Sequence, residues 1–454
     1  MKRKVVSSQV ADNSMQLEVS LPSGRCETVT VSQAGTVADL KRAAQESFGQ
    51  SFLRLAAPDG RLLAPTMPLP LSGLQNGDSL TAVALQPKIA ATRSAFALWC
   101  EGGDRIITWG HPDFGGDSPG VQDQLRNVQQ ISGTFGAFAA LLAEGTVVTW
   151  GHPKYGGDSS RVQAQLRNVK QICGTASAFA AILEDLTVVT WGSRGRGGDC
   201  SRVQHRLKNV QQICGTANVF AAVLADGSAV TWGRRDHDGD SSKVQDQLKN
   251  VQQICATGSA FAAILADGTV VTWGDPDYGG DSSRVQSQLR NVQKICATNT
   301  AFAAILADGS VVTWGHLRYG GDSSRVQHQL RNVQHIYGTN TAFAAILEDG
   351  TVVTWGDPYR GGDSSTVQDR LRNVQKICGT AHAFAALLAD GTVVTWGQPD
   401  YGGDSSRVQD RLRNVQQISG TAHAFAAIVA HGSVVSWGDM GDGGGRVQDL
   451  FSYI

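Results

Sequence analysis

The dipeptide Trp-Gly returns nine times at a fixed spacing of 41 residues, and this period constrains the fold more strongly than any other feature of the sequence. A constant period of this length is typical of a repeat array, in which each unit stacks on its neighbours to bury its apolar surface. We therefore expect nine units of one kind, each with a tryptophan as a structural core residue. These are Trp109, Trp150, Trp191, Trp232, Trp273, Trp314, Trp355, Trp396 and Trp437.

Each repeat contains a pattern typical of a β-hairpin. In the second copy, small and apolar residues from Ala137 to Leu142 lead into the turn Ala143-Glu144-Gly145, and a β-branched run then ends at Trp150. Glycine supplies the positive φ that a tight turn needs. Because the adjacent valines Val147 and Val148 point to opposite sides of the second strand, we expect both sides of that strand to be covered.

The second half of each repeat predicts a turn, a short helical segment and a further strand. The residues from Gly156 to Ser160 are of the types that favour turns. Val162, Leu166 and Val169 follow at helical spacing, with Ser160 as the expected N-cap. The residues up to Cys173 then suit a strand. Each unit is therefore expected to have three strands and an irregular fourth segment.

The first 86 residues lack the repeat and have a different pattern. Residues 1–14 are polar and basic, and we expect a disordered tail there. Alternating apolar residues on both sides of Pro22-Ser23-Gly24 predict a hairpin. The patterns together predict a hairpin over 15–31, a helix with Thr36 as N-cap and Val37, Leu40 and Ala44 on its buried face, and strands at 53–56 and 79–85.

Charge and hydropathy exclude several classes of function. Lys plus Arg number 39 against 40 for Asp plus Glu, so no overall field attracts nucleic acid, which we disfavour as a partner. No apolar run approaches the roughly 18 residues that cross a bilayer, and the N-terminal segment has no apolar stretch of a signal peptide. We therefore expect an intracellular protein, cytoplasmic or nuclear, that does not bind membranes.

The cysteines and acidic residues form no recognisable metal or catalytic motif. Five cysteines occupy one repeat position, so a whole unit separates each from the next and free thiols are expected. Each copy brings one aspartate beside serines and glycines, whereas calcium takes about 6 to 8 oxygens. We assign no catalytic, metal-binding or cofactor-binding residue and expect a protein that is not an enzyme. The five cysteines are Cys173, Cys214, Cys255, Cys296 and Cys378.

Residues 15–86 resemble ubiquitin in their order of hairpin, helix and two further strands. Met15-Gln16-Leu17, Leu53-Arg54-Leu55 and Gly77-Asp78-Ser79-Leu80 carry the resemblance, which implies a small ubiquitin-like β-grasp domain. Leu85-Gln86-Pro87-Lys88 stands where ubiquitin has an exposed diglycine, so the domain is not expected to act as a cleavable modifier. Alanines in Leu55-Ala56-Ala57 replace a bulky isoleucine of ubiquitin's receptor-binding face, which predicts weaker docking.

Residues 87–454 resemble the repeats of the regulator of chromosome condensation family. The core Asp-Gly-x-Val-x-x-Trp-Gly and the glycine-rich loop carry the resemblance, and the family's Gly-x-x-His is present at His382 and His423. The short unit is similar to the compact propellers of that superfamily, which include the bacterial propeller that inhibits β-lactamases. The resemblance implies a mainly β fold, a β-propeller of nine repeats closed by residues 88–92 and 446–454. An open repeat array is the alternative.

The four residues after each Trp-Gly differ from copy to copy, whereas the strands barely change. We predict that these loops share one rim and bind a protein partner, because Tyr and Arg are enriched in binding hot spots. Four arginines from two consecutive copies would favour an acidic partner surface. The predicted contact residues are Arg194, Arg196, Arg234 and Arg235, with Tyr278 and Tyr319 further round the rim.

The sequence therefore predicts a non-catalytic protein-interaction scaffold or adaptor, linked to ubiquitin signalling through its first domain. The resemblance leaves two alternatives: a guanine-nucleotide exchange regulator of a small GTPase, or a relative of the repeat-containing ubiquitin ligases that lacks their catalytic domain. Nucleotide exchange is disfavoured because the family's rim insertions have no counterpart in units of uniform length. A ligase is disfavoured because no room for a catalytic domain follows the repeats.

Overall fold

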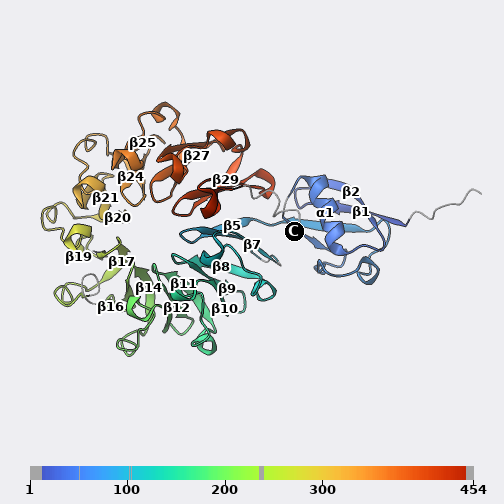
Figure 1. Ribbon diagram of the computed structural model, residues 1–454, viewed down its shortest axis with the longest axis horizontal. Coiled ribbons are helices and arrows are strands. Elements are labelled where there is room, and N and C mark those ends of the chain that lie inside the picture. The colour runs from blue at the N-terminus through green and yellow to red at the C-terminus, as the bar shows by residue number, and fades with distance from the viewer. Residues whose placement is uncertain (1–12, 51, 102, 104, 235–239, 446–454) are drawn as a thin grey trace, which may run out of the picture. The chain divides into compact units, whose positions relative to one another are not determined.

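The computed structural model describes residues 13–50, 52–101, 103, 105–234 and 240–445. The chain divides into two compact units, one formed mainly by the residues up to Pro87 and the other by the repeats from Lys88 onward. In Figure 1 the first unit is blue and the repeats run from cyan to red. The expected disordered tail lies, except for its last two residues, outside the described part of the chain.

The first unit is a four-stranded sheet with one helix packed against it. The strands lie in the order β2-β1-β4-β3, with β1 antiparallel to β2 and parallel to β4. Leu17, Leu40 and Phe48 are buried in its core. The expected hairpin, helix and two later strands are confirmed. The elements are β1 (Ser14–Ser20), β2 (Cys26–Ser32), α1 (Val37–Phe48), β3 (Leu53–Ala56), the 3-10 turn η1 (Leu69–Leu71) and β4 (Ser79–Ala84).

The helix α1 begins where its sequence predicts. The Thr36 hydroxyl accepts a hydrogen bond from the Asp39 backbone N–H at 3.4 Å, and the Asp39 carboxylate accepts one from the Thr36 N–H at 2.8 Å. This reciprocal capping box satisfies backbone donors that the start of a helix leaves without partners. Gly49 then ends the helix in the left-handed conformation, with φ of 63°.

The second unit consists of nine three-stranded sheets, each built from consecutive strands and numbered here in chain order. Figure 1 shows the sheets around a common centre, with one strand of each sheet nearest that centre. The inner strands are β5 (Pro87–Ala91), β8 (Val128–Gly133), β11 (Val169–Gly174), β14 (Val210–Gly215), β17 (Val251–Ala256), β20 (Val292–Ala297), β23 (Val333–Gly338), β26 (Val374–Gly379) and β29 (Val415–Gly420).

The expected hairpin supplies the other two strands of every sheet. The middle strands are β6 (Ala95–Cys100), β9 (Ala137–Leu142), β12 (Ala178–Leu183), β15 (Val219–Leu224), β18 (Ala260–Leu265), β21 (Ala301–Leu306), β24 (Ala342–Leu347), β27 (Ala383–Leu388) and β30 (Ala424–Val429). The outer strands are β7 (Ile106–Gly110), β10 (Val147–Gly151), β13 (Val188–Gly192), β16 (Ala229–Gly233), β19 (Val270–Gly274), β22 (Val311–Gly315), β25 (Val352–Gly356), β28 (Val393–Gly397) and β31 (Val434–Gly438).

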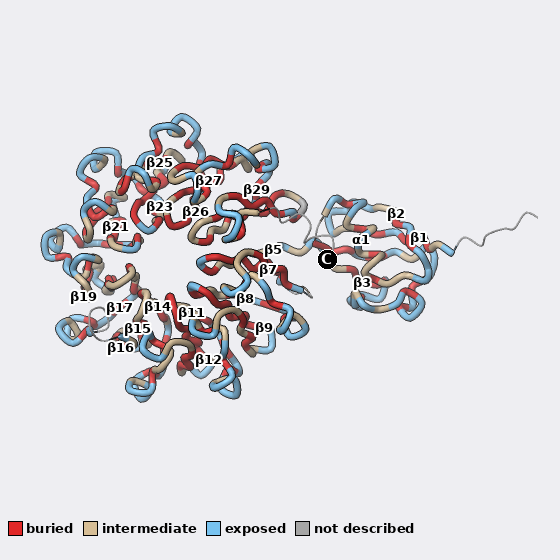
Figure 2. The backbone as a smooth tube through the Cα atoms, viewed as in Figure 1, coloured by how far each residue is buried: buried red, intermediate tan, exposed pale blue. Residues whose placement is uncertain are grey.

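The tryptophans are buried between neighbouring sheets, and all nine keep only 3% to 7% of their surface exposed. Trp150 stacks on Phe138 with 5.1 Å between ring centroids, and its indole N–H donates to the Gly115 carbonyl of the preceding sheet's loop at 3.1 Å. The alanines of the middle strands are fully buried, which lets the sheets approach closely. Figure 2 shows the result: the strands are mostly buried and the connections between them mostly exposed.

Backbone hydrogen bonds join the sheets near the centre of the ring. In eight of the nine sheets, the residue that follows the threonine after the inner strand donates its N–H to the carbonyl of the equivalent residue in the next sheet. The donor and acceptor pairs are Arg93 and Phe135, Phe135 and Ala176, Ala217 and Gly258, Gly258 and Asn299, Asn299 and Asn340, Asn340 and Ala381, Ala381 and Ala422, and Ala422 and Arg93. The last pair returns from the ninth sheet to the first.

The contact between the ninth and first sheets favours the propeller-like ring over the open array. Besides the Ala422 to Arg93 bond of 2.8 Å, the Trp109 indole N–H donates to the Gly443 carbonyl at 3.2 Å. The first sheet takes its three strands from residues 87–110 alone. The expected contribution of residues 446–454 to closure lies outside the described residues.

The irregular fourth segment of each repeat runs back along the outer strand. The Ser159 and Thr149 hydroxyls lie 3.0 Å apart, the Ser159 hydroxyl donates to the Gln163 side-chain carbonyl at 2.7 Å, and the Gln163 amide donates to the Val147 carbonyl at 2.8 Å. The segment therefore passes from the end of the strand to its start. Its helical turns are η3 (Gln122–Gln124), η5 (Gln163–Gln165), η10 (Gln368–Arg370) and η12 (Ser406–Arg411).

The expected N-cap at Ser160 is wrong. The residue that precedes η5 is Val162, and no side chain caps this turn. The Ser160 N–H instead donates to the Asp158 carboxylate at 2.9 Å. An aspartate carboxylate readily accepts a hydrogen bond from the backbone N–H two residues ahead. Ser160 therefore belongs to the turn around Asp158, which precedes the helical turn.

Candidate protein-interaction site

The segments that follow the inner and outer strands meet on one side of the ring, which we call the Trp-Gly face. In the second sheet the His152 N–H donates to the Gly136 carbonyl at 2.8 Å, and the Thr134 hydroxyl donates to the Tyr155 carbonyl at 2.9 Å. After Trp-Gly the chain forms short helical turns: η2 (Pro112–Phe114), η4 (Pro153–Tyr155), η6 (Arg194–Arg196), η7 (Pro276–Tyr278), η8 (Leu317–Tyr319), η9 (Pro358–Arg360), η11 (Pro399–Tyr401) and η14 (Met440–Gly444).

The opposite side of the ring is formed by the turns between middle and outer strands, and we call it the hairpin face. Here each turn contacts the start of the next sheet's inner strand, as where the Val169 N–H donates to the Gly145 carbonyl at 2.9 Å. Gly145 has the expected positive φ, 78°. In the third sheet Leu186 occupies the same place with φ of 62°, in a region that favours glycine.

Every strongly exposed large apolar side chain among the described residues of the repeats lies on the Trp-Gly face. Phe135 is 44% exposed, Leu317 62%, Met440 78% and Tyr359 81%. Isolated exposed apolar residues are ordinary, and here all four lie on the same side of the ring. This distribution marks the Trp-Gly face as the candidate binding surface.

Asp357 organises the loops of the sixth and seventh sheets on this face. Its carboxylate is 5% exposed and lies 3.9 Å from the Arg318 guanidinium and 4.0 Å from that of Arg360. The same carboxylate accepts a hydrogen bond from the Tyr359 N–H at 3.1 Å. One buried acid therefore orients an arginine from each of two loops, next to the exposed side chains of Leu317 and Tyr359.

The exposure of Tyr359 results from an inverted residue order. In four other copies a tyrosine ends the helical turn, and Tyr155, Tyr278 and Tyr401 are each half-buried against the core between their own sheet and the next. In the seventh sheet Arg360 takes that position and the tyrosine precedes it. The Tyr359 ring consequently projects into solvent, while Arg360 reaches Asp357.

Histidines and tyrosines pack against one another elsewhere on the face. His316 stacks on Tyr319 with 4.3 Å between ring centroids. Tyr401 lies between His382, at 4.4 Å, and His423, at 4.7 Å, and His423 in turn contacts the Asp442 carboxylate. Burial lowers the pKa of His382, and the nearby Arg360 charge lowers it further. His382 is therefore neutral at neutral pH.

The structure places three of the four predicted arginines on the Trp-Gly face. The Arg194 side chain, 79% exposed, lies 3.3 Å from the Asp199 carboxylate. Arg196 donates to the Ser177 hydroxyl at 3.4 Å. Arg234 is exposed, and Arg235 lies outside the described residues. The binding role of these arginines stays a prediction.

The two predicted tyrosines are less accessible than their sequence position suggests. Tyr278 and Tyr319 are both half-buried. Tyr278 packs partly against a core cluster, and Tyr319 lies against His316 and under Arg318. Sequence reasoning missed Leu317, Asp357 and Tyr359. The Pro-Tyr-Arg order of the seventh copy, against Pro-x-Tyr in the second, fifth and eighth copies, was the available signal.

The Trp-Gly face is acidic as a whole. The seven residues after each of the nine Trp-Gly pairs include seventeen aspartates, no glutamate and seven lysines or arginines. A hydrogen bond from the backbone N–H of a serine two residues later lowers the pKa of Asp158, Asp281, Asp322 and Asp404. These groups are anionic at neutral pH, so the face attracts positively charged groups.

The thiols and acids do not form a reactive or metal-binding centre within the described residues. No group of three or more His, Cys, Asp or Glu there could hold a metal ion. None of the eight cysteines forms a disulfide, as expected. Burial raises the pKa of Cys173 and Cys378 to about 11 and that of Cys255 to about 12, so these thiols stay protonated. No helix of the described chain is long and apolar enough to cross a membrane.

Comparisons with known proteins leave the function open. No protein-family model and no curated protein matches the chain. Prp20p from Saccharomyces cerevisiae, described with its binding to Gsp1p and histones, is 16% identical, with 68% of this chain and 82% of that chain covered and a TM-score of 0.39. The computationally designed protein Ika8 is 17% identical, with coverages of 68% and 95% and a TM-score of 0.36.

A designed protein based on ubiquitin is 26% identical, over 16% of this chain and 88% of its own, with a TM-score of 0.15. At these TM-scores, the account of the fold rests on the strands, registers and hydrogen bonds of this chain itself.

Proposed function

We propose that this chain is a non-catalytic protein-interaction scaffold and that its Trp-Gly face binds a protein partner. The observation that carries the proposal is the restriction of Phe135, Leu317, Tyr359 and Met440, all strongly exposed, to this one face. Apolar surface that stays in water on the free protein contributes to stability only when a partner covers it.

The loops of the sixth and seventh sheets form the proposed centre of the site. Leu317 and Tyr359 supply apolar and aromatic surface, and Arg318 and Arg360 supply guanidinium groups, which is the composition of binding hot spots. Because Asp357 already orients both arginines, these long side chains lose less conformational freedom when a partner binds.

The charge of the face indicates the chemistry of the partner. Seventeen aspartates against seven basic residues favour a partner whose apolar anchor is surrounded by lysines or arginines. Arg194 and Arg196 form a local exception on the third sheet. They remain predicted contacts for an acidic group of the same partner.

Matched variants of the full-length chain test the proposal. L317S/Y359S removes two exposed apolar side chains from the proposed centre, and the control L71S removes one from the first unit, where it is 76% exposed. Proteins captured from a cell extract by the wild-type chain are quantified with both variants. We expect at least one captured protein to fall by about tenfold or more with L317S/Y359S, since a hot-spot residue contributes about 2 kcal/mol or more. Equal capture by both variants would contradict the proposal.

We further propose that the first unit connects the scaffold to ubiquitin signalling. It exposes Val83 by 41% and Leu62 by 48%, and Ala56, which forms a backbone bridge with Leu62, is half-buried. A56I in the full-length chain should then bind a ubiquitin-binding domain more tightly than wild type, since each added methylene contributes about 0.8 kcal/mol when buried. No gain over the control A34I, the same substitution at an exposed alanine in the turn after β2, would argue against this connection.

A further inference from the structure

The hairpin face carries basic side chains at the start of its inner strands, and we call this set the basic collar. In eight repeats, a segment of the form Leu, basic residue, Asn, Val, two variable residues and Ile opens the inner strand. These eight segments contain no aspartate or glutamate. Their eleven lysines and arginines are all exposed: Arg126, Arg167, Lys170, Lys208, Lys249, Arg290, Lys294, Arg331, Arg372, Lys376 and Arg413.

Backbone geometry fixes the place of the collar. The asparagine in each segment has a φ between 53° and 56°, which turns the chain sharply into the strand. The N–H of the next valine then donates to a hairpin turn of the preceding sheet, as from Val292 to the Gly268 carbonyl at 2.9 Å. Neighbouring inner strands adjoin, since the Gln130 amide donates to the Ile172 carbonyl at 3.3 Å. The collar cations therefore follow one another around the centre of the hairpin face.

The two variable residues of each segment extend this surface along the inner strands. These sixteen positions hold twelve glutamines together with Lys170, Lys294, His335 and Lys376, and none is acidic or apolar. Glutamine amides donate to carboxylates and accept from peptide N–H groups. The surface thus offers cations and amides together, without a competing acid of its own.

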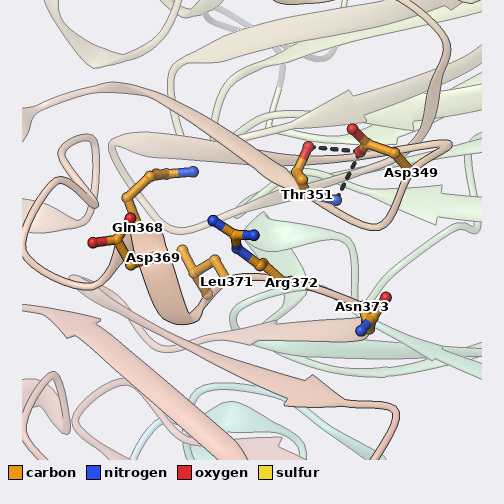
Figure 3. Close-up of a pocket in the computed structure, with 7 residues that line it drawn as sticks. All are labelled: Asp349, Thr351, Gln368, Asp369, Leu371, Arg372 and Asn373. Atoms are coloured by element: carbon orange, nitrogen blue, oxygen red, sulfur yellow. Dashed lines mark hydrogen bonds between the residues drawn. The ribbon is translucent and has the colours of Figure 1, made fainter.

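Carboxylates beside the collar make local hydrogen bonds, and the Glu348 carboxylate accepts one from the Asn332 amide of a collar segment at 3.1 Å. Asp349 accepts hydrogen bonds from the Thr351 N–H at 2.9 Å and from its hydroxyl at 2.6 Å. Figure 3 shows these two bonds at the edge of a cavity of about 440 Å³, with Arg372 between this turn and Gln368. Among the eleven collar cations of the described chain, Arg413 alone has an ion pair, 3.9 Å from Asp410.

Arginines beside the outer strands provide a contrast. Arg161 lies in the segment that runs along β10 and close to Asp158, whose pKa is lowered first by hydrogen bonds from Ser160 and then by the Arg161 charge. The same arrangement recurs at Arg284, Arg325 and Arg407. Those arginines already have an anionic neighbour, whereas most collar cations face solvent.

We propose that the basic collar binds an acidic polypeptide segment. Carboxylates of the segment pair with the collar cations, and its backbone hydrogen-bonds to the glutamine amides. A polypeptide is favoured over a nucleic acid because the eight segments contain no Phe, Tyr or Trp and a single histidine, His335, so they offer no row of rings on which successive bases could stack. This site lies on the opposite face from the proposed partner site and does not depend on it.

Binding of a labelled oligoglutamate peptide to the full-length chain, followed by fluorescence anisotropy, tests the proposal. The collar variant R290Q/K294Q/R331Q/R372Q/K376Q removes five cations from three consecutive repeats. The control R161Q/R202Q/R284Q/R325Q/R407Q removes five exposed arginines beside the outer strands. We expect binding at low salt to weaken by about tenfold or more in the collar variant and by less than about twofold in the control.

Three results would overturn the proposal: no peptide binding by the wild-type chain at low salt, equal weakening in both variants, or tighter binding of an oligothymidylate of equal charge. Equal weakening would mean that net charge alone attracts the peptide. Thermal unfolding at the wild-type temperature shows that a variant is folded. If the collar variant does not fold, the comparison is repeated with two cations removed: K294Q/K376Q as the collar variant and R284Q/R325Q as the control beside the outer strands.

Discussion

The two faces of the ring are made by the same nine repeats, yet their sequences have diverged to very different degrees. On the hairpin face, eight copies keep an asparagine with positive φ before the inner strand, and six of the turns keep a glycine that an acidic residue precedes. On the Trp-Gly face, nearly every copy has a different set of residues after Trp-Gly.

The backbone explains this difference. A hairpin turn and the next inner strand are hydrogen-bonded to each other, and a Cβ on Gly268 would lie 2.9 Å from the Asn291 Cα. Substitutions there disturb both elements. After Trp-Gly, a short turn closed by glycine is sufficient to reverse the chain, so the side chains within the turn can change without disturbing the strands. One face is thus fixed by the fold, while the other is free to acquire binding residues.

The largest contrast should appear between a buried and an exposed aromatic residue. Trp314 is 4% exposed and its indole N–H donates to the Gly279 carbonyl at 3.1 Å, whereas Tyr359 is 81% exposed. Trp314→Ala should lower the free energy of unfolding by about 3–5 kcal/mol, and Tyr359→Ala should change it by less than about 0.5 kcal/mol. Urea denaturation followed by fluorescence measures both. A comparable loss in both variants would mean that Tyr359 is part of the fold rather than of a binding surface.

A smaller difference should separate two equivalent aspartates of the Trp-Gly face. Asp275 and Asp357 each accept a backbone hydrogen bond two residues ahead, at 2.9 Å and 3.1 Å, but Asp357 also faces two arginines. Asp275→Ala should cost about 1 kcal/mol, as for other caps. Asp357→Ala should cost more by a fraction of a kcal/mol, because its arginines are partly exposed. Identical losses in denaturation experiments would show that the arginines contribute nothing to the fold.

On the hairpin face, Leu186 offers a substitution that should stabilise the protein. Its φ is 62°, and glycines occupy the same position in the other hairpin turns of this type with φ of 74° to 78°. Leu186→Gly should therefore raise the free energy of unfolding by up to about 1 kcal/mol, reduced by the loss of apolar contact with the neighbouring core. The reverse change Gly145→Leu should destabilise, since its Cβ would lie 3.0 Å from the Asn168 Cα. A less stable Leu186→Gly variant would show that packing outweighs backbone strain at this turn.

The elements that repeat could be predicted from the sequence, because comparing the copies shows which residue type is kept at each position. Gly145 indicates a turn, and the tryptophan at a period of 41 residues indicates a buried contact between units. The bond from Ala422 to Arg93 could not be predicted, because it joins backbone atoms at opposite ends of the array and depends on no residue type. The connectivity of the ring is thus visible only in three dimensions.

The candidate site was harder to predict than the fold. Counting Tyr and Arg selected Tyr278, whose position in its turn directs the ring toward the core. The relevant property was residue order, which exposes Tyr359 and brings Arg360 to Asp357. Likewise, the partner of Arg194 is Asp199 in the same loop, which sequence composition alone does not pair with it. Exposure and pairing depend on loop geometry, and a short sequence window does not contain it.

The smallest expected effect is a change in how stability depends on pH, and it separates the packed His382 of the Trp-Gly face from the exposed His328. His382 lies against Tyr401, and burial followed by the Arg360 charge lowers its pKa below the usual 6.5. As the pH falls, His382 therefore takes up a proton in the unfolded chain before it does so in the folded chain. Its titration leaves the free energy of unfolding unchanged above about pH 6.5 and lowers that free energy as the pH drops below this value. Aspartates with lowered pKa values titrate well below this range and do not obscure it.

His382→Thr removes this titration and uses the residue that the sixth and seventh sheets already have at Thr300 and Thr341. We expect the urea midpoint of this variant to fall less between pH 7.5 and pH 5.5 than that of wild type, while exposed His328→Thr leaves the wild-type difference unchanged. The same pH dependence in all three proteins would place the His382 ring in solvent. That result would mean that His382 does not pack against Tyr401 in solution. The loops held by Asp357 would then be the better-supported binding centre of the Trp-Gly face.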